Sequence, residues 1–254
     1  DTIKAFNFAD RYQMPVIHVL DKAIANSVVT SKNFDPYKVH IDRGMLTRKV
    51  TEADKGTAGN YLRFRLSDNP ISPRVVLGTK DAIFWNTGDE HTEEGHITED
   101  PELRVQMMEK RMKKLETIID QISEADKLVC YDFPNSNGKY VVISWGSTKG
   151  PILDALKRLS REGSSMKFIQ IKLLHPFPFD TLEKYLNGSS VIIDIEMNFS
   201  SQLGKLIKQH NLRKADYLIV KYNGRPMSSN EVYSSLNNIL QGKGKSREVL
   251  TNGA

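Results

Sequence analysis

The chain has 254 residues, with 36 Lys and Arg against 31 Asp and Glu, so its formal net charge is +5 at pH 7. Apolar residues make up 39% and charged residues 26%, values that exclude a collagen-like or largely disordered chain. The single cysteine, Cys130, excludes an internal disulfide, a four-cysteine zinc site and a cysteine-ligated iron–sulfur cluster within this chain. One cysteine also fits a reducing compartment, so we expect a cytoplasmic protein.

Membranes and nucleic acids are both disfavoured as partners. No run approaches the roughly 18 apolar residues of a transmembrane helix. The basic residues are spread along the chain and interleaved with acidic ones, which does not favour a nucleic-acid surface.

Residues 1–34 read as the end of an α/β unit. Apolar residues at helical spacing predict a helix over residues 5–12, and Pro15–Leu20 predicts a buried strand that contains His18 as a core histidine. Asp21 is placed to cap a short helix over residues 22–28. Because one strand cannot form a stable sheet, we expect this piece to need a partner, in a longer chain or on another subunit.

Residues 35–100 show weak periodicity and many turn residues, which predicts an irregular connecting and interface segment. The aromatic residues Tyr61, Phe64, Phe84 and Trp85 argue against a solvated linker.

The sequence Asp100-Pro101-Glu102 predicts a helix start, with Asp100 as the cap, and the apolar stripe continues to Ile122. Beyond it, apolar strands alternate with helices throughout residues 101–241, which predicts an α/β domain with a mostly parallel sheet covered on both faces. We expect residues 242–254 to be a mobile tail. The strands are predicted at 127–132, 140–145, 167–174, 190–196 and 217–221, and the helices at 150–161, 179–186, 200–210 and 229–240.

The acidic segment Gly88–Asp100 contains His91, Glu93, Glu94 and His96 but no Lys or Arg. One interpretation is a metal site, although histidines five residues apart do not share a helix face. A second is a functional loop at an active-site entrance, with histidine as proton donor or anion contact. A third is an acidic loop that caps the next helix and pairs with its basic face.

Two other patterns suggest anion binding, each with a simpler alternative. The turn Ser144–Gly150 joins a strand to a helix as phosphate-binding turns do, but a tight connection capped by Ser147 or Thr148 is the favoured explanation. Four arginines are candidate clamps for carboxylate or phosphate, and each is otherwise a salt-bridge residue. They are Arg43, Arg63, Arg65 and Arg74. Cys130 fits an inert core thiol.

Six runs of the sequence are distinctive when taken together: Ile71–Arg74, Gly88–Pro101, Met108–Leu115, Ser144–Gly150, Leu174–Pro178 and Lys221–Pro226. In this order they resemble one family, the α subunit of archaeal 2-oxoacid:ferredoxin oxidoreductases. The likeness covers nearly the whole chain, and the opening residues Phe6–Ala25 resemble the end of that subunit's pyrimidine-binding thiamine domain.

The resemblance implies that this chain is the C-terminal portion of a subunit. Residues 1–34 would end the pyrimidine-binding domain, residues 35–100 would connect, and residues 101–241 would form a transketolase C-terminal-like domain. The whole enzyme, a heterodimer with a β subunit, would oxidatively decarboxylate a 2-oxoacid with coenzyme A and pass electrons to ferredoxin. Thiamine diphosphate, Mg²⁺ and a 4Fe-4S cluster would be held mainly by the β subunit, so this portion would bind none of them alone and would be inactive by itself.

Three hypotheses follow. In the first, this portion of the α subunit is mainly structural, and His91, Glu93, Glu94 and His96 line the approach to the substrate or to coenzyme A, where they orient groups or transfer protons. In the second, the chain is a free-standing α/β module that binds an anion at residues 147–150. In the third, it is a metal-dependent hydrolase that uses the loop from His91 to His96.

Overall fold

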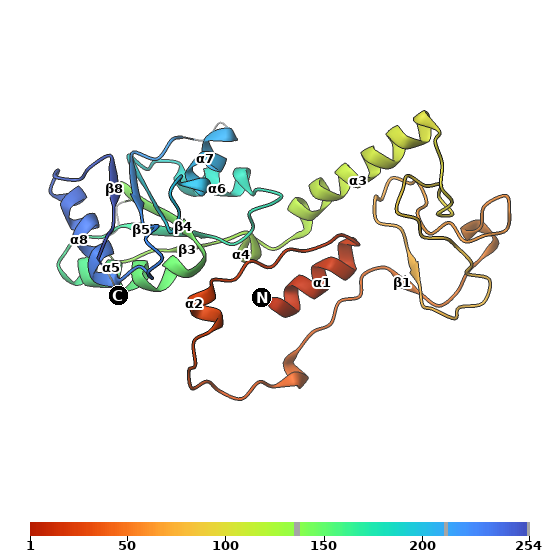
Figure 1. The fold of residues 1–254 in the computed structure, drawn as a ribbon, viewed down its shortest axis with the longest axis horizontal. Coiled ribbons are helices and arrows are strands. Elements are labelled where there is room, and N and C mark those ends of the chain that lie inside the picture. The colour runs from red at the N-terminus through yellow and green to blue at the C-terminus, as the bar shows by residue number, and fades with distance from the viewer. Residues whose placement is uncertain (135–137, 211–212, 253–254) are drawn as a thin grey trace. The chain divides into compact units, whose positions relative to one another are not determined.

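The computed structural model describes residues 1–134, 138–210 and 213–252, and the chain divides into two compact units (Figure 1). The first unit comprises Asp1–Val19 and Thr30–Gln121, and the second comprises Leu20–Val29 and Ile122–Ala254. Within the described ranges, no helix has both the length and the apolar composition needed to cross a bilayer.

The second unit is built on a six-stranded sheet with the order β3-β5-β4-β6-β7-β8. Every neighbouring pair is parallel except β3 with β5. This confirms the predicted α/β class with a mostly parallel sheet. The strands are β3 (Leu128–Tyr131), β4 (Tyr140–Trp145), β5 (Lys167–Ile171), β6 (Val191–Glu196), β7 (Tyr217–Val220) and β8 (Arg247–Val249). The helical elements are α2 (Lys22–Ala25), α4 (Glu124–Lys127), η3 (Gly146–Thr148), α5 (Lys149–Arg161), α6 (Phe179–Leu186), α7 (Gln202–Gln209) and α8 (Ser229–Leu240).

The side-chain alternation of the strands creates two hydrophobic layers. Val142 on β4 packs in the layer that includes residues of α5 and α8, whereas its neighbours Val141 and Ile143 pack in the layer that includes α6 and α7. Since successive strand residues point to opposite faces, a central strand that is apolar on both faces needs helices on both sides. Figure 1 shows this arrangement, with α5 and α8 on one side of the sheet and α6 and α7 on the other.

The C-terminal residues correct one expectation. β8 pairs in parallel with β7, Leu250 is buried, and Lys221 Nζ donates to the Asn252 carbonyl at 2.6 Å. The tail predicted as mobile therefore contains the edge strand β8; residues 253–254 lie outside the described residues. A three-residue strand between glycines is too short to give a periodic signal in the sequence.

The first unit consists mainly of loops, with two longer helices, α1 (Thr2–Tyr12) and α3 (Pro101–Gln121). The segment 35–100 is irregular, as expected, and its order comes from buried aromatic and apolar side chains: Tyr61 is 2% exposed and packs edge-on against Phe84 at 6.2 Å. Its regular elements are η1 (Pro36–Lys38), β1 (Leu46–Thr47), η2 (Glu52–Asp54) and β2 (Arg74–Val75), with β1 and β2 paired in parallel.

The predicted strand Pro15–Leu20 is wrong for this structure. These residues have no strand assignment, Ile17 is 88% exposed, and His18 is exposed rather than in a core. The described residues offer this apolar segment no neighbouring strand, and a single strand is not stable alone. The Asp21 cap is confirmed, since Asp21 Oδ1 accepts from the Ala23 amide at 2.8 Å.

Helix α3 begins where the sequence predicted. Asp100 Oδ1 accepts from the amides of Glu102 and Leu103 at 2.9 and 3.0 Å, so Asp100 caps α3. The helix, however, groups with the first unit, which ends at Gln121, whereas the sequence placed it in a domain covering residues 101–241. The thiamine-type and transketolase-type assignments of these ranges stay predictions.

Candidate functional site

The acidic segment forms a tight turn anchored in the first unit. His91 and Ile97 make an antiparallel bridge, and the Thr92 amide donates to the His96 carbonyl at 2.8 Å. Gly95 is buried with φ +95°, and a Cβ added there would lie 1.8 Å from the Trp85 carbonyl oxygen. Only glycine fits this position, which brings the turn against the aromatic residues of the preceding segment.

The two carboxylates of the predicted site fasten the turn to residues 60–66. Glu93 Oε1 accepts from the Leu66 amide at 2.6 Å, and its carbonyl accepts from the Phe64 amide at 2.8 Å. Glu94 Oε2 accepts from Asn60 Nδ2 at 3.0 Å. Both side chains therefore hold the loop in shape as well as carrying charge.

The two histidine rings pack against different aromatic side chains. The His91 ring is 4.1 Å from that of Phe64, and its Nδ1 is 2.9 Å from the Thr92 carbonyl oxygen. The exposed His96 ring is 3.9 Å from that of Trp85. Across the residues with assigned positions, no three His, Cys, Asp or Glu side chains come together as metal ligands would. The metal-dependent hydrolase hypothesis therefore has no support from this geometry.

Glu90 connects the loop to α3. Arg104 donates to its carboxylate at 2.7 Å, and Arg111 donates to both of its oxygens. These hydrogen bonds, chiefly from Arg111, lower the pKa of Glu90 to about 2. With the Asp100 cap, this confirms the third interpretation of the loop, helix capping and pairing with the basic helix face, for these two residues.

Three of the four candidate arginines form internal salt bridges. Arg43 and Arg74 both contact Asp10, at 2.6 and 3.2 Å, and Arg65 contacts Asp54 at 3.2 Å. Arg63 is the exception: its guanidinium carbon lies 5.0 Å from the Phe64 ring centroid, and no carboxylate in the described ranges lies within 4.0 Å.

Two lysines that the sequence placed only on the polar side of α3 lie beside Arg63. Lys110 Nζ donates to the carbonyls of Phe64 and Arg65 and to Ser72 Oγ, and Lys114 Nζ donates to the Gln13 carbonyl at 3.2 Å. We call Arg63, Lys110 and Lys114 the basic cluster. Burial, with repulsion from neighbouring cations, lowers the pKa of each lysine to about 8.

The hydroxyl groups in and beside the turn after β4 form hydrogen bonds with other groups of this chain. Ser147 Oγ donates to Asp21 Oδ2 at 2.9 Å, Thr148 Oγ1 donates to the Trp145 carbonyl at 2.9 Å, and Ser144 Oγ donates to the Ile195 carbonyl. The Asp21 carboxylate thus lies where an anion would bind at the start of α5. These contacts favour the tight connection over a phosphate-binding turn.

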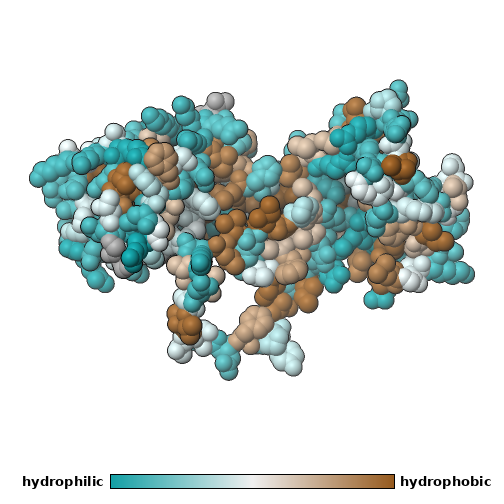
Figure 2. All heavy atoms as spheres, viewed as in Figure 1, coloured by the Kyte–Doolittle hydropathy of each residue, from teal (hydrophilic) through white to brown (hydrophobic). Residues whose placement is uncertain are grey.

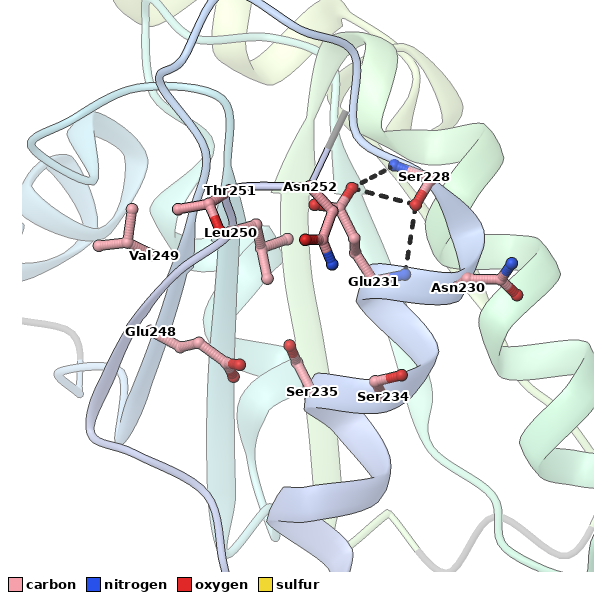
Figure 3. Close-up of a pocket in the computed structure, with 10 residues that line it drawn as sticks. All are labelled: Ser228, Asn230, Glu231, Ser234, Ser235, Glu248, Val249, Leu250, Thr251 and Asn252. Carbon is pink, nitrogen blue, oxygen red and sulfur yellow. Dashed lines mark hydrogen bonds between the residues drawn. The ribbon is translucent and has the colours of Figure 1, made fainter. Parts of the chain in front are cut away.

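Two polar sites in the second unit were missed by the sequence analysis. A pocket of about 400 Å³ between α8 and the segment Glu248–Asn252 is lined mostly by polar side chains (Figure 3). Its Glu231 is used structurally: it caps α8 through Ser228 and pairs with buried Lys221 at 2.7 Å. Elsewhere, Asp194 and Glu196 on β6 are fully buried. The sequence gives no signal for either site, because only the fold brings these residues together.

Comparison with known proteins gives matches along the chain. Residues 138–232 match the family model "pyruvate:ferredoxin oxidoreductase core domain II", and residues 1–110 match "pyruvate flavodoxin/ferredoxin oxidoreductase, thiamine diP-bdg". The chain is 40% identical over 256 aligned positions to 2-oxoacid:ferredoxin oxidoreductase 2, subunit alpha, of Aeropyrum pernix, covering 100% of this chain and 38% of that protein. It is 39% identical to 2-oxoacid:ferredoxin oxidoreductase subunit alpha of Saccharolobus solfataricus, over 98% of this chain and 38% of that one.

A solved structure shows a similar fold. It is the 2-oxoglutarate:ferredoxin oxidoreductase from Magnetococcus marinus with 2-oxoglutarate, coenzyme A and succinyl-CoA bound, with a TM-score of 0.77 and 27% identity. The similarity covers 91% of this chain and 38% of that one. The present chain therefore spans well under half the length of the relatives that it matches.

Proposed function

Because this chain belongs to the α-subunit family of the 2-oxoacid:ferredoxin oxidoreductases, we propose that it works as part of a heteromeric enzyme of that activity. The enzyme oxidatively decarboxylates a 2-oxoacid, transfers the acyl group to coenzyme A and passes the electrons to ferredoxin. The observation that carries the proposal is similarity at 40% identity along the whole chain, joined to a shared fold over 91% of it.

The redox and carbon chemistry of this enzyme belongs to cofactors. When bound, thiamine diphosphate with Mg²⁺ would supply the nucleophilic carbon that decarboxylation needs, and a 4Fe-4S cluster would carry electrons. The single Cys130, whose pKa burial raises, does not fit a cluster ligand set. We therefore assign the cluster and the metal to the β subunit; the match of residues 1–110 to a thiamine-binding family supports a share in the cofactor domain. The cytoplasmic location stays a prediction.

The role proposed for most of this portion is to form interfaces. Large apolar side chains between residues 17 and 37 are strongly exposed: Ile17 at 88%, Val28 at 99% and Tyr37 at 97%. Figure 2 shows exposed apolar side chains in brown on the face in view. Exposed apolar patches mark sites of protein association. The remainder of the α subunit and the β subunit are the partners expected to cover them.

For the acidic loop, we keep the first hypothesis as a proposal: His91, Glu93, Glu94 and His96 line the approach to the substrate or to coenzyme A. The exposed ring of His96 supports proton transfer, and the anchored carboxylates support a rigid orientation of the loop. In the assembled enzyme, His91→Ala and Glu94→Ala should each lower kcat/KM about tenfold, or about 1.4 kcal/mol. If both variants keep full activity, the loop serves only as a structural cap.

The activity itself is tested with the assembled subunits. We expect ferredoxin reduction that requires both a 2-oxoacid and coenzyme A, and that yields one acyl-coenzyme A for each 2-oxoacid consumed. Ferredoxin reduction with no dependence on coenzyme A, across a panel of aliphatic and dicarboxylic 2-oxoacids, would refute the proposal.

A further inference from the structure

The basic cluster of the first unit holds three partly buried cations, none of them in a salt bridge with a described residue. Burial and the neighbouring cations lower the pKa of Lys110 and outweigh the nearby Glu93 carboxylate, which raises it. The Lys110 ammonium uses all three of its hydrogens on uncharged acceptors, the carbonyls of Phe64 and Arg65 and the hydroxyl of Ser72. Lys114 contacts one uncharged acceptor, the Gln13 carbonyl. Counting only residues that the structure describes, no carboxylate lies within salt-bridge distance of Arg63, Lys110 or Lys114.

This arrangement differs from the rest of the unit. The neighbouring Arg65 and Arg74 each face an aspartate, and Arg111, one position from Lys110, is held by Glu90. Keeping like charges together and partly desolvated is unfavourable unless an anion neutralises them. The lowered pKa values of the two lysines have the same physical origin. The folded chain therefore presents a cationic site with unused binding capacity.

We propose that Arg63 and Lys114, with the added positive charge of Lys110, bind a phosphate group. A guanidinium offers five N–H donors and Lys114 has two hydrogens left, so seven donors are available. A single carboxylate has only two oxygens and one charge. A phosphate has three or more oxygens and up to two charges, which matches a fork-shaped donor beside an ammonium.

The residues around the basic cluster hold it rigid and place it beside the acidic loop. The Phe64 ring lies 5.0 Å from the Arg63 guanidinium carbon and 4.1 Å from the His91 ring, and its carbonyl accepts from Lys110. Glu93, on the same loop as His91, is fixed by the Leu66 amide. The phosphate site therefore borders the loop that we propose to line the approach to the substrate or coenzyme A.

The phosphate has two possible sources, coenzyme A and free inorganic phosphate. Only this question of source rests on the proposed function. The recognised chemistry is the same in both cases, since oxyanions are bound by fixed N–H donors and positive charge.

The site is tested by direct binding to the assembled enzyme. Inorganic pyrophosphate is titrated by calorimetry into wild type and into Arg63→Gln, Lys114→Met and Lys113→Met enzymes. Arg63→Gln and Lys114→Met should each raise the dissociation constant about tenfold. Lys113→Met is the matched control, because Lys113 is exposed on the same helix, and it should change the constant less than about twofold. The proposed site would be refuted if wild type did not bind pyrophosphate, or if both site variants bound it as tightly as wild type.

The source is separated by steady-state kinetics. If coenzyme A supplies the phosphate, Arg63→Gln raises KM for coenzyme A about tenfold but leaves the reaction with pantetheine, which lacks phosphate, unchanged. If KM for coenzyme A is unchanged while pyrophosphate binding is lost, the site serves free phosphate. Calorimetry needs no turnover, so an enzyme that binds pyrophosphate but lacks the oxidoreductase activity would refute the proposed function and leave the site intact.

Discussion

The guanidinium of Arg111 donates hydrogen bonds to both carboxylate oxygens of Glu90, with Nη1 3.0 Å from Oε1. The side chain of Glu90 is only 8% exposed, and Arg104, two turns earlier on α3, donates to the same carboxylate. Bidentate, partly buried pairs of this kind are screened less than exposed ones. The acidic loop is therefore fixed to α3 at one end by this contact and at the other by the Asp100 cap.

Removing the charge of Glu90 should destabilise the first unit. Glu90→Gln loses charge-assisted hydrogen bonds to two arginines, so we expect a loss of about 2 kcal/mol in the free energy of unfolding at pH 7. The folded-state pKa, about 2, lies below the ordinary value of 4.5, so this contribution is present above pH 4.5 and is lost as the pH falls towards 2. Urea unfolding from pH 7 to pH 3 should show the difference between wild type and variant shrinking; a constant difference would contradict the pairing.

The features that the sequence predicted best are those that depend on neighbouring residues. Strand 140–145 and helices 179–186 and 229–240 begin and end where expected, because each has continuous apolar periodicity between clear turn residues. The Asp100-Pro101 helix start is likewise a local pattern. The prediction of a strand at Pro15–Leu20 was wrong because a strand is stable only when it pairs with a neighbouring strand. Among the described residues, no strand pairs with this segment.

The basic cluster could not be found from local pattern. Arg63 lies in an irregular loop, and Lys110 and Lys114 follow it by more than 40 positions in a helix rich in basic residues. Among these lysines, only the fold distinguishes the exposed Lys113 from Lys114, which contacts the Gln13 carbonyl. Likewise, the four candidate arginines look equivalent in the sequence, and only the placement of Asp10 and Asp54 shows which of them are already paired.

The Asp100 cap can be tested by a single substitution. Asp100→Ala leaves the amides of Glu102 and Leu103 without their acceptor, so it should cost about 1 kcal/mol of folding stability. Asp89→Ala is the control, since Asp89 is an exposed acid in the same loop. Chemical denaturation of the two variants should separate their midpoints; equal midpoints would show that the cap contributes nothing.

The two glycines of the acidic loop should respond differently to the same change. Gly95→Ala introduces a Cβ 1.8 Å from the Trp85 carbonyl oxygen at a φ of +95°, so we expect at least about 2 kcal/mol of destabilisation. Gly88→Ala meets nothing within 4 Å and should be close to neutral. Thermal unfolding of both variants measures this contrast, and a tolerated alanine at 95 would mean that the turn is not fixed against Trp85.

Asp194 and Glu196 should make the stability of the second unit depend on pH. Glu196 accepts hydrogen bonds from Trp145 Nε1 at 2.8 Å and from the Leu203 amide at 2.8 Å. Asp194 is 0% exposed, and neither of its oxygens has a hydrogen-bond partner of normal geometry among the described residues. Burial, reinforced by the negative charge of Glu196, raises the pKa of Asp194 well above its ordinary value of 3.8.

The sign of the effect follows from the raised pKa. The folded chain binds the Asp194 proton more tightly than the unfolded chain, so stability falls as the pH rises from 3.8 towards the folded-state pKa. Asp194→Asn stays neutral in both states and loses this dependence. Its stability relative to wild type should therefore increase with pH, reaching a net gain near pH 8, while Asp154→Asn, an exposed substitution on α5, should follow wild type. Urea midpoints measured from pH 4 to pH 8 test this; a variant that runs parallel to wild type would show that Asp194 is ionised in the folded protein.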